Sequence, residues 1–243
     1  DNVLVHFIRN APSQLEKARF SAERERSIGL GAMGFHAYLQ RLNIPFESAM
    51  AKGKNMAMFK HIKAEAVRAT KDLAVQRGEA PDAVGTGVRN CHLMAIAPNA
   101  SSSIICGNTS PSIEPYRANA FAQKTKSGTS LQKNEYLEDV LRDMGMDTEE
   151  VWKDITTKGG SVQHLDFLDD WTKDVFKTAV EIDQRWVIDM AADRQEEICQ
   201  SQSLNVFFPA NVSKQELHSV HMMAWKKKLK TLYYLRSEAM KRA

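Results

Sequence analysis

The sequence predicts an α/β fold that is rich in helices and has short strands. Stretches of Ala, Lys, Glu, Met and Leu with helical spacing alternate with short apolar runs bounded by Pro or Gly. The 243 residues, 43% of them hydrophobic, are enough for a packed core. No repeat, low-complexity tract or linker divides the chain, so we expect residues 1–243 to form one unit without an internal boundary.

The first part of the chain is expected to be helical and to lead into a strand. From Pro12 to about Gly78 the apolar spacing is mostly that of helices, with an interruption at Pro45 and with Gly78 as a C-cap. The stretch "EAPDAVGTG" predicts a loop. The short apolar run "HLMAIAP" favours a strand that ends at Pro98.

Further helices and strands alternate toward the C-terminus. "NAFAQKTKSGTSLQKN" predicts a hairpin that turns at Ser127-Gly128. Helices are expected at 135–144, at 148–158 (opened by Asp147) and at 167–199, the last interrupted or bent. The remaining expected elements are a buried strand in "SLNVFFPAN", a helix at 213–228 with a capping box of Ser213 and Glu216, and a final strand in "KTLYYLRS".

Composition argues against several classes of protein. The formal charge of +3 is too small for the general positive field of a nucleic-acid binder, and "WKKKLK" lies at a helix end where cations complement the dipole. No membrane span or signal peptide is evident, so we expect a soluble, cytoplasmic chain. The first residue, Asp1, suggests a piece of a longer or processed protein.

The cysteines and histidines predict neither a disulfide scaffold nor a metal site. Cys91, Cys106 and Cys199 are an odd number without close pairing, which fits a reducing compartment, and lone thiols in apolar runs are usually small buried hydrophobes. His218 and His221 are three apart on an expected helix, but no cysteine has the spacing to complete a zinc site.

Three glycines spell a motif that usually binds dinucleotides. Gly29, Gly31 and Gly34 in "SIGLGAMGF" form G-x-G-x-x-G, but no strand precedes them and no acidic residue follows at the required distance. Close packing of a helix against its neighbours explains these glycines better.

The stretch "PNASSSI" is a candidate anion site. If a helix begins near Ser101, the backbone amides of residues 100–103 lie at its N-terminus, where donors and the helix dipole favour an anion. The stretch has no lysine, so a phosphate would need amides, hydroxyls and a distant cation such as Arg117. A serine-rich helix cap is the alternative.

Two adjacent tyrosines, Tyr233 and Tyr234, allow two interpretations. On a regular strand they point to opposite faces, which favours simple packing with one ring buried. If their phenols are in contact, they are instead able to pass an electron and a proton between them.

Three stretches together closely resemble the C-terminal part of the large, catalytic subunit of class I ribonucleotide reductases: "RNCHLMAIAPNASSSIICGNTSPSIEPYRAN", "ICQSQSLNVFF" and "HMMAWKKKLKTLYYLRS". The resemblance runs from "RSIGLGAMGF" to "YYLRS". It implies the C-terminal portion of a ten-stranded α/β barrel with a finger loop inside. It also implies that Tyr233 and Tyr234 transfer a radical, and that the substrate diphosphate is bound by Pro98, Asn99, Ala100, Ser101, Ser102 and Ser103. Asn99 stands where other members often have Thr or Ser.

The resemblance places several parts of the enzyme outside this sequence. The thiyl-forming and substrate-reducing cysteines, the finger loop and most of the allosteric ATP/dNTP sites belong to N-terminal segments, and the cysteine tail that often follows the tyrosines is absent after "SEAMKRA". The implied partners are the N-terminal part of the large subunit, a radical-generating small subunit with a metal, and thioredoxin or glutaredoxin. The chain itself is expected to bind no metal or cofactor.

The resulting hypothesis is that the chain is part of a ribonucleoside-diphosphate reductase, which replaces the 2′-hydroxyl of ribonucleoside diphosphates by hydrogen through radical chemistry. One alternative is a non-catalytic nucleotide-diphosphate-binding or assembly module, in which the tyrosines only pack. A basic helical nucleic-acid binder is a second alternative, suggested only by "WKKKLK".

Overall fold

The computed structural model describes residues 1–125 and 128–237. Ser127, in the expected hairpin turn, and residues 238–243, which include most of "SEAMKRA", lie outside the described residues. Within the described part, no helix is both long enough and apolar enough to cross a membrane.

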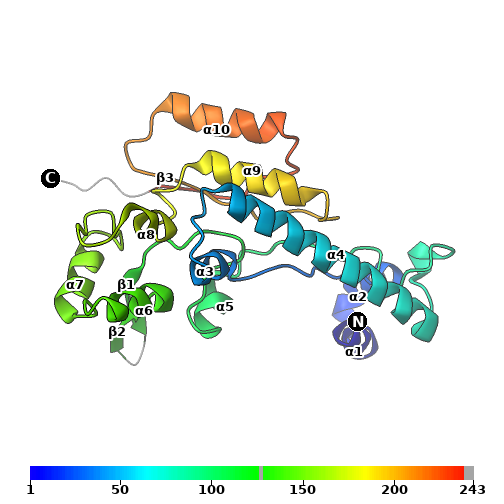
Figure 1. The fold of residues 1–243 in the computed structure, drawn as a ribbon. Helices are drawn as coiled ribbons and strands as arrows, with labels where there is room; N and C mark the ends of the chain where they lie inside the picture. Colours follow the sequence, from blue (N-terminus) through cyan, green and yellow to red (C-terminus); the bar gives the residue numbers. More distant parts are fainter. Residues whose placement is uncertain (126–127, 238–243) are drawn as a thin grey trace.

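Three helices stack on one side of the molecule. Helix α9 (Gln184–Gln195) lies between α4 (Ala49–Arg77) and α10 (Lys214–Lys226), as Figure 1 shows. Gly78 ends α4 with a positive φ of 82°, and the side chain of Ser213 accepts the amide of Glu216 at the start of α10. The C-cap at Gly78 and the Ser213 half of the predicted capping box are therefore confirmed.

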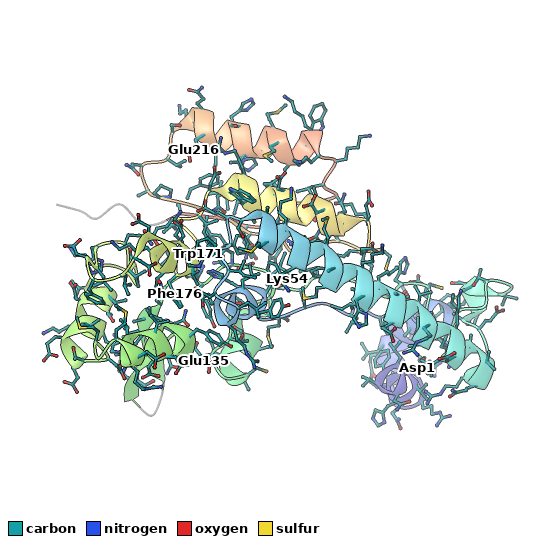
Figure 2. The ribbon with its side chains drawn as sticks, in the orientation of Figure 1. Asp1, Lys54, Glu135, Trp171, Phe176 and Glu216 are labelled. Atoms are coloured by element: carbon teal, nitrogen blue, oxygen red, sulfur yellow. The ribbon has the colours of Figure 1, made fainter. Side chains whose placement is uncertain are left out.

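The N-terminal segment forms three shorter helices. They are α1 (Asn2–Asn10), α2 (Glu16–Glu25) and α3 (Phe35–Arg41), with single 3-10 turns at Ser13–Leu15 and Pro81–Ala83. Helix α1 was not expected from the sequence. Asp1 lies beside the far end of α4, where its carboxylate meets Arg77 at 2.9 Å and Arg89 at 3.3 Å (Figure 2).

Four extended segments lie side by side beneath the helices, in the order 28–30, 92–96, 200–208 and 233–237. Single parallel bridges join Leu30 to Met94 and Ile96 to Gln202. The last two segments contain β3 (Val206–Phe208) and β4 (Leu235–Ser237), which pair in parallel. This arrangement is that of an open stretch of parallel sheet, as expected for part of an α/β barrel.

The expected strand in "HLMAIAP" is therefore reduced to isolated bridges. The amide of Ala95 donates to Leu30 on one side, and the amide of Ile96 donates to Ser201 on the other. Further backbone bonds join each pair of segments, such as Ile28 to His92 and Ser203 to Ile96, but only one regular bridge forms on each side. The buried strand of "SLNVFFPAN" is confirmed, although it is short.

A second lobe is built around a hairpin. Strands β1 (Ala120–Thr125) and β2 (Gly128–Lys133) are antiparallel, with Thr125 opposite Gly128, and they pack with α6 (Glu135–Asp143) and α7 (Glu149–Thr157). Figure 2 shows Glu135 at the start of α6 and Trp171 and Phe176 beside the same lobe. The two expected helices are confirmed.

Two details of the expected helices differ. Thr148, rather than Asp147, caps α7, because Asp147 instead accepts the indole N–H of Trp152 at 2.7 Å. The long segment 167–199 is interrupted, as expected, into α8 (Asp170–Val175) and α9.

The buried side chains form two clusters. The larger cluster joins the helical stack to the extended segments and includes Phe35, Leu39, Phe59, Met94, Ile96, Ile188, Val206 and Phe208. The smaller one lies inside the hairpin lobe and includes Leu137, Leu141, Trp152, Ile155, Val175 and Phe176.

The glycine motif marks close packing, as predicted, but residues 26–34 are non-helical rather than part of the expected helix, because this segment pairs with 92–96. A Cβ on Gly31 would lie 2.5 Å from the carbonyl oxygen of Ala95, and one on Gly29 would lie 3.1 Å from the Cβ of Ala95. Gly34 has a φ of +83°, and its added Cβ would meet Thr109 at 2.7 Å. These glycines let segment 28–34 lie against the strand that leads into the candidate anion loop.

We predict that Gly31→Ala destabilises the chain by about 2 kcal/mol, because the obstructing atom is backbone and has no rotamer to change. Gly53→Ala is the matched control. Gly53 lies inside α4 with nothing within 4 Å of the added Cβ, so this change should stabilise by about 1 kcal/mol. Denaturant unfolding of both variants tests the prediction, and equal effects of the two substitutions would contradict it.

Candidate functional site

The candidate anion loop leads into a short helix that projects away from the helical stack (Figure 1). Helix α5 (Ala100–Ile105) follows Asn99, whose φ of 53° lies in the left-handed region that Asn tolerates. The amides of a helix's first turn have no acceptor within the helix. One expectation is wrong: the amide of Ser103 is not free, because it donates to the carbonyl of Asn99 at 3.0 Å.

A cavity of about 390 Å³ lies beside this loop. Pro98, Ala100 and Ser103 line it, whereas Ser101 and Ser102 are exposed on the adjacent turn. The hydroxyl of Ser103 is buried and donates to the carbonyl of Ala100 at 3.0 Å, so this side chain holds the turn. The loop therefore presents the cavity with backbone and small side chains.

Two arginines give the cavity a positive charge. Arg117 and Arg236 both line it, and among the described residues no carboxylate lies within 4 Å of either guanidinium. Arg117 stacks over the ring of Phe207 at 5.8 Å from its centroid. The distant cation expected near the loop is thus present, together with a second one.

Among residues 1–125 and 128–237, the one carboxylate that lines the cavity is Glu114, which is 5% exposed. Burial raises its pKa to about 7, against the opposing effects of Arg236, of a hydrogen bond from Asn205 and of Arg117. At neutral pH the carboxyl is therefore partly protonated and does not cancel both guanidinium charges. A site with this balance suits an anion.

Tyr233 and Tyr234 are in contact with each other. Their ring centroids are 4.0 Å apart at an angle of 46°, and the hydroxyl of Tyr233 donates to that of Tyr234 at 3.2 Å. Both are about half exposed. The expectation that they point to opposite faces of a strand is wrong, because β4 begins only at Leu235.

The cause is a one-residue slip in the β3–β4 ladder. The amide of Val206 donates to the carbonyl of Tyr234, and a regular parallel ladder would next join the amide of Tyr234 to Leu204. The carbonyl of Leu204 instead accepts the amide of Tyr233 at 2.9 Å. This bulge adds one residue to the second segment and brings both phenols to one side.

The side chain of Asn205 accepts the backbone amide of Tyr234, which the bulge leaves without a ladder partner. Its Oδ1 accepts the amide of Tyr234 at 3.0 Å, and its Nδ2 donates to Oε1 of Glu114 at 2.6 Å. Arg236 lies over the ring of Tyr234 at 5.2 Å. The cavity and the tyrosine pair are thus joined by two residues, Asn205 and Arg236.

A buried histidine supports the floor of the cavity. His36 is fully buried, and its Nδ1 accepts the amide of Tyr116, two residues after Glu114, at 2.9 Å. Burial lowers the pKa of His36 to about 3, so the ring is neutral in the folded protein.

The histidines and cysteines considered in the sequence, all within the described residues, are not grouped into a site. The Nδ1 of His221 lies 2.7 Å from the carbonyl of Leu217, and among residues 1–125 and 128–237 no three His, Cys, Asp or Glu side chains are grouped to hold a metal. The three cysteines are free; Cys106 is exposed, contrary to the buried thiol expected, and Cys91 is half-buried.

The basic stretch at the end of α10 has internal partners. Lys227 pairs with Asp189 at 2.6 Å, and Lys230 donates to the carbonyls of Ile198, Cys199 and Gln200 at 2.7–3.1 Å. These bonds hold the segment that leads into 200–208, so Lys227 and Lys230 stabilise the fold.

The structure thus combines an open stretch of parallel sheet with a cavity lined by two arginines and, beside it, two phenols in contact. The sequence matches the family described as "Ribonucleotide reductase, barrel domain" over residues 2–84 and 81–235. The chain belongs to this family and corresponds to a C-terminal barrel-domain portion of a ribonucleotide reductase large subunit.

Individual relatives agree with the family. The ribonucleoside-diphosphate reductase large subunit of Invertebrate iridescent virus 6 is 52% identical over 98% of this chain and 25% of its own length. The putative ribonucleoside-diphosphate reductase large subunit of Frog virus 3 is 50% identical, over 98% of this chain and 42% of its own length. The chain therefore spans less than half of these relatives.

A solved structure has the same fold. The Actinobacillus ureae class Id ribonucleotide reductase alpha subunit superposes with a TM-score of 0.90 at 40% identity, covering 98% of this chain and 44% of that one. The fold expected from the resemblance, part of an α/β barrel that is rich in helices with short strands, is confirmed.

Sequence reasoning assigned no role to three residues of the site: Glu114, Asn205 and Arg236. Each lies inside a stretch that carries the resemblance, "SIEPYRAN", "SQSLNVFF" or "YYLRS". The available signal was the type and place of each side chain. Glu114 is a charged residue next to a proline, and Asn205 and Arg236 are polar residues in apolar runs.

We predict that acid destabilises the chain through His36. Its folded pKa of about 3 lies below the unfolded value, so between about pH 6.5 and 3 the unfolded chain binds more protons. The free energy of unfolding should fall in this window as pH falls, by up to about 1.4 kcal/mol per pH unit.

Denaturant midpoints at pH 7.5 and 5.0 measure this effect. His36→Gln should show a smaller loss between the two pH values than the unmodified chain, whereas His218→Gln, at an exposed position of α10, should show the same loss. An unchanged loss in His36→Gln would refute the assignment.

Proposed function

We propose that the chain acts as the part of a ribonucleoside-diphosphate reductase that holds the substrate diphosphate and carries the radical-transfer tyrosines. Residues 98–103 would bind the phosphates, and Tyr233 and Tyr234 would pass the oxidising equivalent inward. The observation that carries this proposal is the junction of the two features: Asn205 and Arg236 both line the cavity and contact Tyr234.

The cavity has the chemistry that a diphosphate needs. On the exposed turn beside the cavity, the first-turn amides and the hydroxyls of Ser101 and Ser102 would supply donors, and inside the cavity Arg117 and Arg236 would supply charge. Asn99, in the left-handed conformation, precedes this turn. Fixing the phosphates fixes the ribose, and small positional errors in the reacting group are costly in rate.

The phenol pair has the geometry for a balanced transfer. An oxidised phenoxyl at one tyrosine takes one electron from its neighbour, together with the proton of the 3.2 Å hydrogen bond, and becomes a phenol again. The neighbour becomes the phenoxyl. The pair returns to two phenols when the second phenoxyl takes an electron and a proton from the next group on the path, which the proposal assigns to the catalytic cysteine of another segment.

Such a function requires other protein parts. The proposal assigns the catalytic cysteines and allosteric ATP/dNTP sites to other segments of the large subunit, the radical to a metal-containing small subunit, and the reductant to thioredoxin or glutaredoxin. The non-catalytic nucleotide-diphosphate binder is the alternative that the tyrosine variants below address.

We predict that Tyr234→Phe in the assembled reductase lowers turnover by at least about 100-fold while nucleotide binding stays near normal, because the ring remains and only the oxidisable O–H is lost. Tyr38→Phe, at an exposed position of α3, is the control and should keep full turnover. Steady-state assays and equilibrium nucleotide binding measure the two properties. Full turnover in Tyr234→Phe would support the non-catalytic alternative.

We predict that the double variant Ser101→Ala and Ser102→Ala weakens nucleotide binding about tenfold or more, because each lost charge-assisted hydrogen bond contributes about 1 kcal/mol or more. Ser219→Ala, at an exposed position of α10, should bind normally. Binding titrations with a ribonucleoside diphosphate measure the affinity. Unchanged affinity in the double variant would show that the two hydroxyls do not bind the phosphates.

A further inference from the structure

The bulge before β4 leaves one backbone donor without a ladder partner. Because the carbonyl of Leu204 accepts the amide of Tyr233, the amide of Tyr234 bonds to the side chain of Asn205 instead. In a regular ladder the two tyrosines would lie on opposite faces with their phenols apart. The contact between the phenols therefore depends on what stabilises the bulge.

We propose that Asn205 and Glu114 are positioning residues for the tyrosine pair: together they hold the slipped ladder that brings the two phenols into contact. This inference rests on the proposed role of the tyrosines. Neither residue is assigned to the chemistry itself, because neither contacts a phenol oxygen.

The amide of Asn205 is held in one orientation. It is 2% exposed, and its two polar atoms face opposite kinds of partner: Oδ1 faces the amide of Tyr234 and Nδ2 faces the carboxylate of Glu114. A flipped amide would place two donors together and two acceptors together. Glu114 thus selects the orientation that accepts from Tyr234.

Loss of the Asn205 acceptor should favour a return from the bulge to the regular ladder. A partly buried N–H without an acceptor costs about 1–3 kcal/mol. Returning to the regular ladder recovers a bond, because the amide of Tyr234 is then able to donate to Leu204. Removal of the Asn205 side chain should therefore separate the phenols and leave the rest of the fold in place.

Glu114 also connects the hydrogen bond between Asn205 and Tyr234 to the cavity. It lines the same cavity as Arg117 and Arg236, and the guanidinium of Arg236 lies over the ring of Tyr234. The wall of the proposed phosphate site and the backbone of the tyrosine pair thus share one hydrogen-bonded unit. The backbone that carries the tyrosine pair is therefore held next to the proposed phosphate site.

The test uses four variants in the assembled reductase: Asn205→Leu, Asn205→Asp, Glu114→Gln and the double variant E114Q/N205D. Asn205→Leu removes both bonds and should lower kcat at least about tenfold, with the nucleotide dissociation constant within about threefold of normal. Asn205→Asp places a second carboxyl group against Glu114 and should lose most turnover at alkaline pH, where both groups are ionised and repel each other. Glu114→Gln keeps an acceptor for Asn205 and should retain more turnover than either.

The double variant is the decisive one. It exchanges donor and acceptor, because an amide at position 114 now donates to a carboxylate at position 205, which still accepts from the amide of Tyr234. Its kcat should exceed that of Asn205→Asp by at least about fivefold. Failure of this rescue, or a normal kcat in Asn205→Leu, would overturn the inference.

Two controls separate the possible failures. Gln202→Leu removes another buried amide of the same segment, which bonds to Arg194 and Ala191, and should lower stability with little effect on kcat. An equal loss of kcat in Gln202→Leu would indicate that Asn205 has only a structural role. If Tyr234→Phe is inactive but Asn205→Leu is normal, only the positioning role fails; if Tyr234→Phe is active, the proposed function itself fails.

Discussion

The hydrogen bond from the amide of Tyr234 to the side chain of Asn205 is the interaction on which the site depends. It allows a parallel ladder to slip by one residue and still satisfy its backbone donors. The slip places two adjacent aromatic side chains on the same side, which a regular strand forbids. A local backbone irregularity therefore creates the contact that a pair of phenols needs for passing an electron and a proton.

Electrostatics and burial complete the site from the other side. Glu114 is buried near two arginines that, within the part of the chain the structure describes, have no carboxylate within 4 Å, and burial outweighs their charge in setting the pKa of Glu114. The surrounding floor is held by a neutral histidine, His36, whose ring accepts the amide of Tyr116. The positive cavity is thus made by groups that the fold fixes before any anion arrives, which keeps the cost of ordering them low on binding.

Sequence reasoning gave the helices well, because apolar periodicity and capping residues are local signals: Gly78 and Ser213 end and begin helices as expected. It overestimated the strand at 92–96, because bridges depend on neighbours distant in the sequence. The loop at 98–103 and the tyrosine pair were singled out from their residues, and the resemblance supplied the roles expected of them. The bulge at Tyr233 was beyond reach, since period-two reasoning assumes a regular ladder, and so was the role of Asn205, which only three-dimensional contacts define.

The most direct test is an experimental structure of the assembled reductase with a ribonucleoside diphosphate bound. The account predicts phosphate oxygens within hydrogen-bonding distance of the amides of Ala100 to Ser102, with the two phenols in contact and Asn205 bonded to the amide of Tyr234. Phosphates bound elsewhere, or a regular ladder with the tyrosines on opposite faces, would contradict it.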